Sequence, residues 1–145
     1  MDLTPYYQAV EDCVTELGID PKLCRGKHTG QWNLRKNSIE VRVDVFKKEK
    51  DKFGYFQCIA AVSKIPETRT LEFYEDVLEK SHQLFGVGLT KYKEWIYIKI
   101  IRELEGIEKT EIMNSMQRIG NYAVTLSNDF KDKYFTDNNG RPDEV

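Results

Sequence analysis

Strict alternation of apolar and polar residues predicts three consecutive strands in the first half of the chain. Trp32 and Leu34 alternate with polar neighbours, and after the turn signal Asn37-Ser38 the same period of two continues at Ile39, Val41, Val43 and Val45. The charged run "KKEKDK" then leads through Gly54 into "YFQCIAAVSKI", which Pro66 ends. A period of two is typical of half-buried strands. Because the connections are short, the three strands are expected to form an antiparallel meander.

Helical spacing predicts three helices around these strands. The first covers about residues 5–17, with Thr4 as N-cap and Gly18 at its end. The second begins near Thr70, and we interpret its apolar positions as one stripe that packs on the sheet: Leu71, Tyr74, Val77, Leu78, Leu84 and Phe85. On its polar side, Lys80 is the expected ion-pair partner of Asp76.

The closing helix is the longest predicted element and begins at Thr110. Its apolar residues are spaced alternately four and three apart, which is typical of one buried helix face: Ile112, Met116, Ile119, Ala123, Leu126 and Phe130. Gly120 interrupts good helix formers at a cost of about 1 kcal/mol relative to alanine. We expect this glycine to leave room for the close approach of another element.

The segment "KEWIYIKII", residues 93–101, is apolar on both faces and is interpreted as a strand of about residues 95–104 that follows a shorter one. If Ile96, Ile98 and Ile100 face the helices, their neighbours point to the opposite face. Three helices cannot easily cover both faces of a five-stranded sheet. We therefore predict a partner-binding or dimer face that contains Phe46, Trp95, Tyr97 and Ile101. The competing interpretation is that the closing helix or the tail covers this face.

The predicted fold class is α+β, in the order helix, three-strand meander, helix, two strands, helix, with an antiparallel sheet packed against the helices. Residues 1–135 form the expected single domain, and the polar residues 136–145 an expected flexible tail. The segments "WNLRKNSIEVRVDVF", "TLEFYEDVLEKSHQLF" and "EIMNSMQRIGNYAVTLSNDFKDKYF", in this order, resemble the architecture of the YbjN-like proteins and the type III secretion chaperones. This resemblance implies a dimeric protein that binds other proteins and has no catalytic centre.

Composition and charge narrow the choice of partner only slightly. The 145 residues carry 22 basic and 24 acidic side chains, so a net charge of −2 selects neither nucleic acid nor an anionic membrane. No stretch approaches the roughly 18 apolar residues of a membrane span, and the amino terminus does not resemble a signal peptide. We expect a cytoplasmic protein whose three cysteines are reduced, with Cys13 and Cys58 as small buried apolar residues.

Candidate chemistry is sparse. The two histidines, His28 and His82, lie in no metal-binding pattern, and the glycines form no phosphate-binding spacing. The serines and cysteines lack the flanking residues of an activated nucleophile. We therefore predict no enzymatic activity, no metal and no cofactor.

The sequence favours a non-enzymatic protein-binding module, chaperone-like or regulatory, that acts as a homodimer. The alternative is a module for single-stranded nucleic acid that uses cationic and aromatic strand residues: Trp32, Arg35, Lys91, Tyr92, Lys93, Trp95 and Tyr97. Interleaved acidic residues make nucleic acid the less favoured partner, because cationic surface supplies most of the affinity of such proteins.

Overall fold

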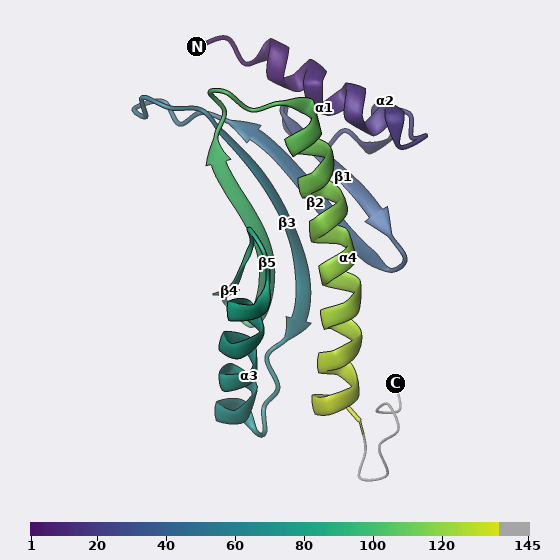
Figure 1. The fold of residues 1–145 in the computed structure, drawn as a ribbon, viewed down its shortest axis with the longest axis vertical. Helices are drawn as coiled ribbons and strands as arrows, with labels where there is room; N and C mark the ends of the chain where they lie inside the picture. Colours follow the sequence, from purple (N-terminus) through teal and green to yellow (C-terminus); the bar gives the residue numbers. More distant parts are fainter. Residues whose placement is uncertain (137–145) are drawn as a thin grey trace.

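The computed structural model describes residues 1–136 and contains one five-stranded antiparallel sheet with helices (Figure 1). The elements are, in chain order, α1 (Thr4–Glu16), α2 (Pro21–Cys24), β1 (Gln31–Lys36), β2 (Ile39–Phe46), β3 (Tyr55–Lys64), α3 (Thr70–Gln83), β4 (Gly88–Tyr92), β5 (Trp95–Glu103) and α4 (Lys109–Tyr134). The strand order in the sheet is β1-β2-β3-β5-β4. The α+β class and the order of the main elements are confirmed. Of the expected tail, residues 137–145 lie outside the described part of the chain.

The meander has the register that the alternating pattern requires. Val43 lies opposite Trp32 on β1 and opposite Cys58 on β3, and all three side chains are buried. The β1–β2 turn places Asn37 at a positive φ of 55°, a conformation that asparagine tolerates better than most residues. One sheet face is therefore an apolar surface available for helix packing.

Strand β5 inserts between β3 and β4 rather than at the edge of the sheet. Ile96 and Ile98 are fully buried, and Ile100 packs against the core from a partly exposed position. Trp95 and Ile101 are 41% and 47% exposed, as expected for side chains on the other face. The predicted division of this segment between two faces is confirmed.

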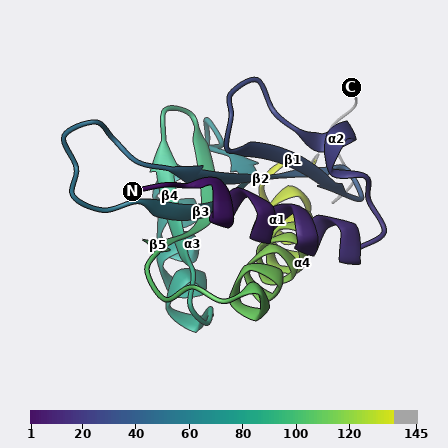
Figure 2. The same ribbon diagram turned by 90° about the horizontal axis from the view of Figure 1, so that it is seen from above.

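Helices α1, α3 and α4 all lie on one side of the sheet, and the other side has no helix across it among the described residues (Figure 2). The predicted seam of α4 is buried along its whole length: Ile112, Met116, Ile119, Ala123, Leu126 and Phe130. Next to this seam, a Cβ atom added at Gly120 would lie 3.3 Å from Lys36 Cδ and 3.8 Å from Val41 Cγ2. The expected close approach at Gly120 is therefore an approach of β1 and β2 to α4.

Helix α3 does not bury one apolar stripe, and this part of the sequence interpretation is wrong. Phe73 and Val77 are the buried residues, while Leu71 and Leu78 are 74% and 71% exposed. At about 100° per residue, Phe73 and Val77 share a face that lies well away from Leu71 and Leu78. Both faces of the helix carry apolar residues, and the sequence interpretation therefore took two separate apolar stripes for one.

The stretch before β1 contains a short helix, α2. Asp20 caps it by accepting a hydrogen bond from the backbone N of Lys22 at 3.0 Å, and Pro21 begins the helical turn. Cys24 at its end is buried, as are Cys13 and Cys58, and none of the three forms a disulfide. Burial raises the pKa of the Cys58 thiol, which keeps it protonated. The prediction of buried, reduced Cys13 and Cys58 is confirmed.

Candidate functional site

The predicted partner face lies on the open side of the sheet, but its four apolar residues do not form one continuous patch. Phe46 packs on Tyr55 across β2 and β3, with ring centroids 5.8 Å apart. Ile101 lies further along β5 and is paired with Gln57, while Tyr97 is paired with Ala61 beyond it. The partner-binding role of Phe46, Trp95, Tyr97 and Ile101 stays a prediction.

Polar side chains near Ile101 are bonded to one another on this open face. Asp44 accepts hydrogen bonds from Gln57 at 3.1 Å and Gln31 at 3.3 Å, and it forms an ion pair with Arg42 at 3.0 Å. Its side chain is only 13% exposed. This part of the sheet surface is a satisfied polar network rather than an apolar docking surface.

Three strongly exposed apolar side chains lie on and just after α3. Leu71, Leu78 and Phe85 are 74%, 71% and 75% exposed. Leu71 and Leu78 are seven residues apart and therefore line one side of the helix, and Phe85 follows the helix after the extended residue Leu84. We call these three residues the α3 seam. The sequence interpretation assigned them to the core, although the seven-residue spacing was a signal for a separate stripe.

A polar clasp holds α3 against the end of α4. Lys133 donates to Asp76 at 2.7 Å, and the hydroxyl of Tyr134 also donates to Asp76. The hydrogen bond from Lys133 lowers the pKa of Asp76, while burial and the Asp76 hydrogen bond raise the pKa of Tyr134. Because Asp76 pairs with α4, the expected pairing with Lys80 is wrong. The clasp fixes α3 so that the α3 seam faces away from the core.

A groove runs between the end of α1, the edge strand β1 and α4. Its volume is about 280 Å³, and its apolar lining is Leu17, Ile19, Leu34, Val41 and Met116. Arg35, Lys36 and Gln117 are among the polar residues around it. Within the described residues, the free side of β1 pairs only at Trp32, where Arg25 forms an isolated bridge. Edge-strand backbone and an apolar groove therefore lie side by side.

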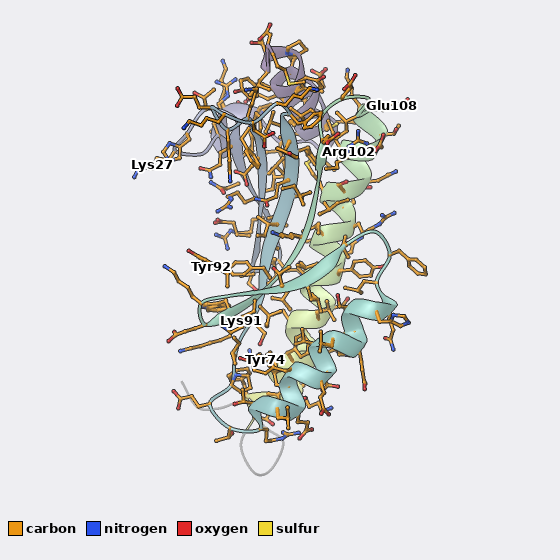
Figure 3. All side chains as sticks on the ribbon, turned by 90° about the vertical axis from the view of Figure 1, so that its left-hand side faces the viewer. Lys27, Tyr74, Lys91, Tyr92, Arg102 and Glu108 are labelled. Carbon is orange, nitrogen blue, oxygen red and sulfur yellow. The ribbon has the colours of Figure 1, made fainter. Side chains whose placement is uncertain are left out.

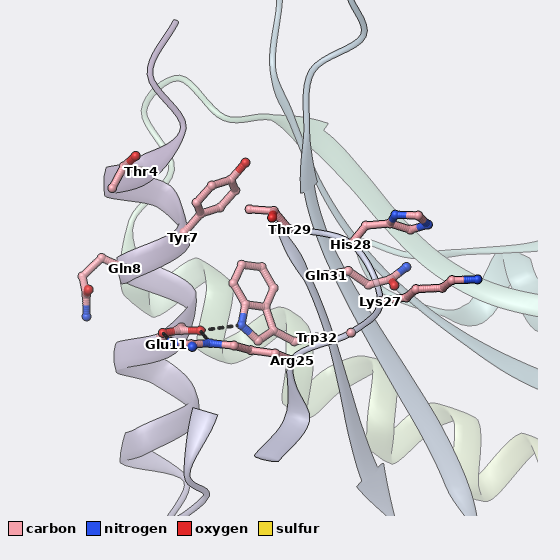
Figure 4. A pocket seen from close by; sticks show the side chains of 12 residues that line it. Thr4, Tyr7, Gln8, Glu11, Arg25, Lys27, His28, Thr29, Gln31 and Trp32 are labelled. Atoms are coloured by element: carbon pink, nitrogen blue, oxygen red, sulfur yellow. Dashed lines mark hydrogen bonds and ion pairs between the residues drawn. The ribbon is translucent and has the colours of Figure 1, made fainter. Parts of the chain in front are cut away.

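A second pocket, of about 370 Å³, lies between α1 and the segment before β1 (Figure 4). Glu11 lies at the centre of this pocket. Its carboxylate accepts hydrogen bonds from Arg25 Nε at 2.7 Å, from Arg25 Nη2 at 2.8 Å and from Trp32 Nε1 at 2.9 Å. The hydrogen bonds from Arg25 are the main reason that the pKa of Glu11 is lowered. Gly30 closes this segment at φ +84°, where an added Cβ would lie 2.4 Å from the Val45 carbonyl oxygen. The polar groups here hold α1 to the sheet.

Replacing Glu11 by glutamine should lower the free energy of unfolding by about 1 to 2 kcal/mol at neutral pH, because charge-assisted hydrogen bonds to Arg25 and Trp32 are weakened. The lowered pKa of Glu11 means that this stabilisation is present above its unfolded pKa and is lost as the pH falls through its folded pKa. Urea unfolding at neutral pH and at about pH 3 should show the parent and the variant converging in acid. Glu16→Gln, an exposed change on the same helix, is the control; an equal loss in both variants would contradict the role of Glu11.

The residues of the nucleic-acid alternative are not brought together as a set. Trp32 is only 2% exposed and donates to Glu11, so its ring is not available to stack on a base. Tyr92, Trp95 and Tyr97 remain at least partly accessible near the β4–β5 turn. Of the aromatic residues named for nucleic-acid binding, those that remain accessible all lie at one end of the sheet.

Neither metal-ligand clusters nor membrane-spanning helices are present in residues 1–136. No group of three or more histidine, cysteine, aspartate or glutamate side chains in this range is placed to hold a metal ion. No helix in the same range combines the length and apolar character that crossing a bilayer requires.

Comparison with known proteins finds similarity at the level of structure. Neither a protein-family model nor a curated protein matches the sequence. The ExsC–ExsE complex matches with a TM-score of 0.65 and 10% identity, over 88% of this chain and 96% of the matched chain. The HopA1–SchA chaperone–effector complex matches with a TM-score of 0.63 and 10% identity, over 88% and 98%. The Yersinia pestis type III secretion chaperone SycH, in complex with a stable fragment of YscM2, matches with a TM-score of 0.58 and 15% identity, over 83% and 98%.

This chain has the type III secretion chaperone fold. At 10–15% identity the likeness is one of fold, and it extends over nearly the whole length of each matched chain. The resemblance to secretion chaperones that the order of elements predicted is confirmed. In this secretion-chaperone fold, the α3 seam and the groove beside β1 are the exposed apolar features with the clearest geometry.

Proposed function

We propose that this protein is a non-enzymatic, chaperone-like module that binds a segment of a protein partner and acts as a homodimer. The observation that carries the proposal is the shared fold: the matched structures include a chaperone–effector complex and a secretion chaperone in complex with a fragment of another protein. Fold alone does not determine function. Two surfaces of this chain also suit a protein partner: the groove beside β1 and the α3 seam.

The groove beside β1 supports the binding of an extended or helical apolar segment. Leu17 at the end of α1 and Met116 on α4 both line it, and the free edge of β1 offers backbone N–H and C=O groups alongside. A partner segment that adds to a strand edge gains main-chain hydrogen bonds, while the groove accepts its apolar side chains. Arg35 and Lys36 at the rim would keep such a segment in register through polar contacts.

The α3 seam supports homodimerisation. Leu71, Leu78 and Phe85 expose apolar side chains of a size that interfaces bury, and a twofold axis would place the same stripe of a second copy against them. The clasp between Asp76 and α4 keeps the seam presented to solvent in the single chain. An extended groove on one side and a dimer helix on the other leave both surfaces free to act together.

The regulatory, YbjN-like role remains the second form of this proposal. Both forms bind protein and neither has a catalytic centre. Genomic neighbourhood separates them: a place within a secretion operon favours the chaperone role, and an isolated gene favours the regulator.

A displayed random-peptide library selected against the purified protein tests the groove. We expect enrichment of apolar segments, and Leu17→Glu should abolish that enrichment by placing a charge at the mouth of the groove. Leu17 is 38% exposed, so the substitution leaves the core intact. For synthetic peptides from the selection, fluorescence anisotropy should show affinity reduced at least about tenfold in Leu17→Glu, equivalent to about 1.4 kcal/mol.

The matched control is Leu23→Glu, because Leu23 is 84% exposed on α2 and does not line the groove. It introduces the same charge and should keep the enrichment and the affinity. Equal behaviour of the two variants, or the absence of any enriched apolar segment, would remove the groove from the proposed function.

A further inference from the structure

A hollow of about 480 Å³ lies on the open face of the sheet, on the side away from α4. Three cationic residues line it, Arg42, Lys91 and Lys99, together with Tyr92 and Tyr97. Lys91 and Tyr92 lie at the β4–β5 turn (Figure 3). No lining residue of this hollow also lines the groove beside β1.

The register of the strands explains the hollow. Arg42, Ile59 and Lys99 form one row across β2, β3 and β5. In the next row, Ala61 is paired with Tyr97 on β5, and Glu40 on β2 lines the same hollow. Because Ala61 has only a methyl side chain, the surface is low there, whereas long side chains rise around it. The result is a shallow basin with a small apolar floor and a cationic and aromatic rim.

The charge of this basin is opposite to that of the whole chain. Glu40 is the one carboxylate among its described lining residues, and it already lies 3.8 Å from Arg35. Neither Lys91 nor Lys99 forms an ion pair with any carboxylate in residues 1–136. A protein of net charge −2 thus has a concave site with surplus positive charge and two tyrosines.

We infer that this basin binds an acidic, extended segment of the protein partner. Carboxylates of the segment pair with Lys99 and Lys91, and an apolar side chain between them lies on Ile59 and Ala61 beside the Tyr97 ring. The inference rests on the proposed function in one respect, that the partner is a protein. It adds the charge of the partner and a second contact surface to the groove beside β1.

The observations favour an acidic peptide over a nucleic acid. Single-stranded nucleic acid needs a cationic track that follows several consecutive phosphates. Here Arg42, Lys91 and Lys99 gather in one basin, and the sheet surface beyond it carries the carboxylates of Asp44 and Glu103. The volume of about 480 Å³ suits a few residues of an extended chain rather than a long strand.

The test is a selection of displayed random peptides on the parent, on Lys99→Glu and on the control Lys22→Glu. Lys22 is exposed on α2 and lies outside the basin, so the two variants carry the same change of charge. Peptides enriched on the parent and on Lys22→Glu should contain clustered aspartate and glutamate, and Lys99→Glu should lose that enrichment. Circular dichroism establishes that both variants are folded.

The strongest acidic peptide is then synthesised with glutamates and, separately, with glutamines in their place. The glutamate form should bind the parent at least about tenfold more tightly at about 50 mM salt, and the difference should shrink at about 300 mM salt as the charges are screened. Absence of acidic enrichment on the parent, or equal enrichment on Lys99→Glu and Lys22→Glu, would overturn the inference. Tighter binding of a mixed-sequence oligonucleotide, lost in Lys99→Glu, would overturn it in favour of nucleic acid.

A negative result for the basin can be distinguished from a negative result for the proposed function. Leu17→Glu acts on the groove and Lys99→Glu on the basin, and the two residues lie on different surfaces. If apolar enrichment depends on Leu17 while acidic enrichment is absent, the proposed function stands and the basin has no such role. If the acidic peptides bind through Lys99 while the groove selects nothing, the basin is a protein-binding site and the groove is not.

Discussion

The substitution Ile119→Asp is expected to leave the domain largely unfolded or insoluble. Ile119 has no exposed surface and lies in the middle of the buried seam of α4, the helix that packs against the central strands. An unpaired carboxylate in this position costs several kcal/mol, whether it stays charged or takes up a proton. The whole stability of a domain of this size is about 5 to 15 kcal/mol, so one such change removes a large part of it.

Far-ultraviolet circular dichroism and urea unfolding of the soluble fraction measure this effect. Asn121→Asp is the matched control, because Asn121 is exposed on the same helix and the change introduces the same carboxylate. That control should keep the parent's unfolding midpoint within about 0.5 kcal/mol. An Ile119→Asp protein with an unchanged midpoint would show that α4 does not pack on the sheet in solution.

The double substitution Leu71→Glu and Leu78→Glu is expected to convert a dimer into a monomer while the fold is kept. Both side chains are more than two-thirds exposed in the single chain, so glutamate there disturbs no core contact. In a dimer built on the α3 seam, replacing each leucine removes about 1.5 to 3 kcal/mol of stabilisation by apolar burial per copy. Glutamates facing each other across a twofold axis add repulsion. We expect the dissociation constant to rise at least about a hundredfold.

Light scattering coupled to size-exclusion chromatography, over a range of concentrations, measures the mass of parent and variant. Leu23→Glu serves as control, since it removes an equally exposed leucine from α2 and should leave the mass unchanged. A double variant that keeps the dimer mass would place the interface elsewhere, and the predicted face of Phe46, Trp95, Tyr97 and Ile101 would be tested next with Tyr97→Glu. A parent that is monomeric at all concentrations would contradict the dimer itself.

The strands and the long helix could be predicted because each has one buried face with a regular period. In β2, every second residue from Val41 to Val45 is buried, and in α4 the spacing of four and three from Ile112 to Phe130 matches a single helix face. Where one side of an element faces the core and the other faces solvent, the sequence period and the structural period coincide. The order of such elements also predicted the secretion-chaperone fold.

The candidate surfaces were predicted less well, because they depend on which of two apolar faces is covered. Leu78 and Phe73 are both apolar residues on α3, and their spacing indicates that they lie on different faces of the helix but not which face packs on α4. The groove beside β1 likewise combines Leu17, Leu34 and Met116 from three distant segments, so no contiguous motif marks it.

By itself, then, the sequence determined the elements, their order and the inward rows of the sheet, since local periodicity and turn residues set these. Only the tertiary structure decided the long-range pairs. Glu11 is bonded to Trp32 rather than left in solvent, and Asp76 to Lys133 across 57 residues rather than to nearby Lys80. The physical reason is that a charged side chain pairs with whichever group the packing of the backbone brings within about 3 Å, and that distance is a property of the assembled fold.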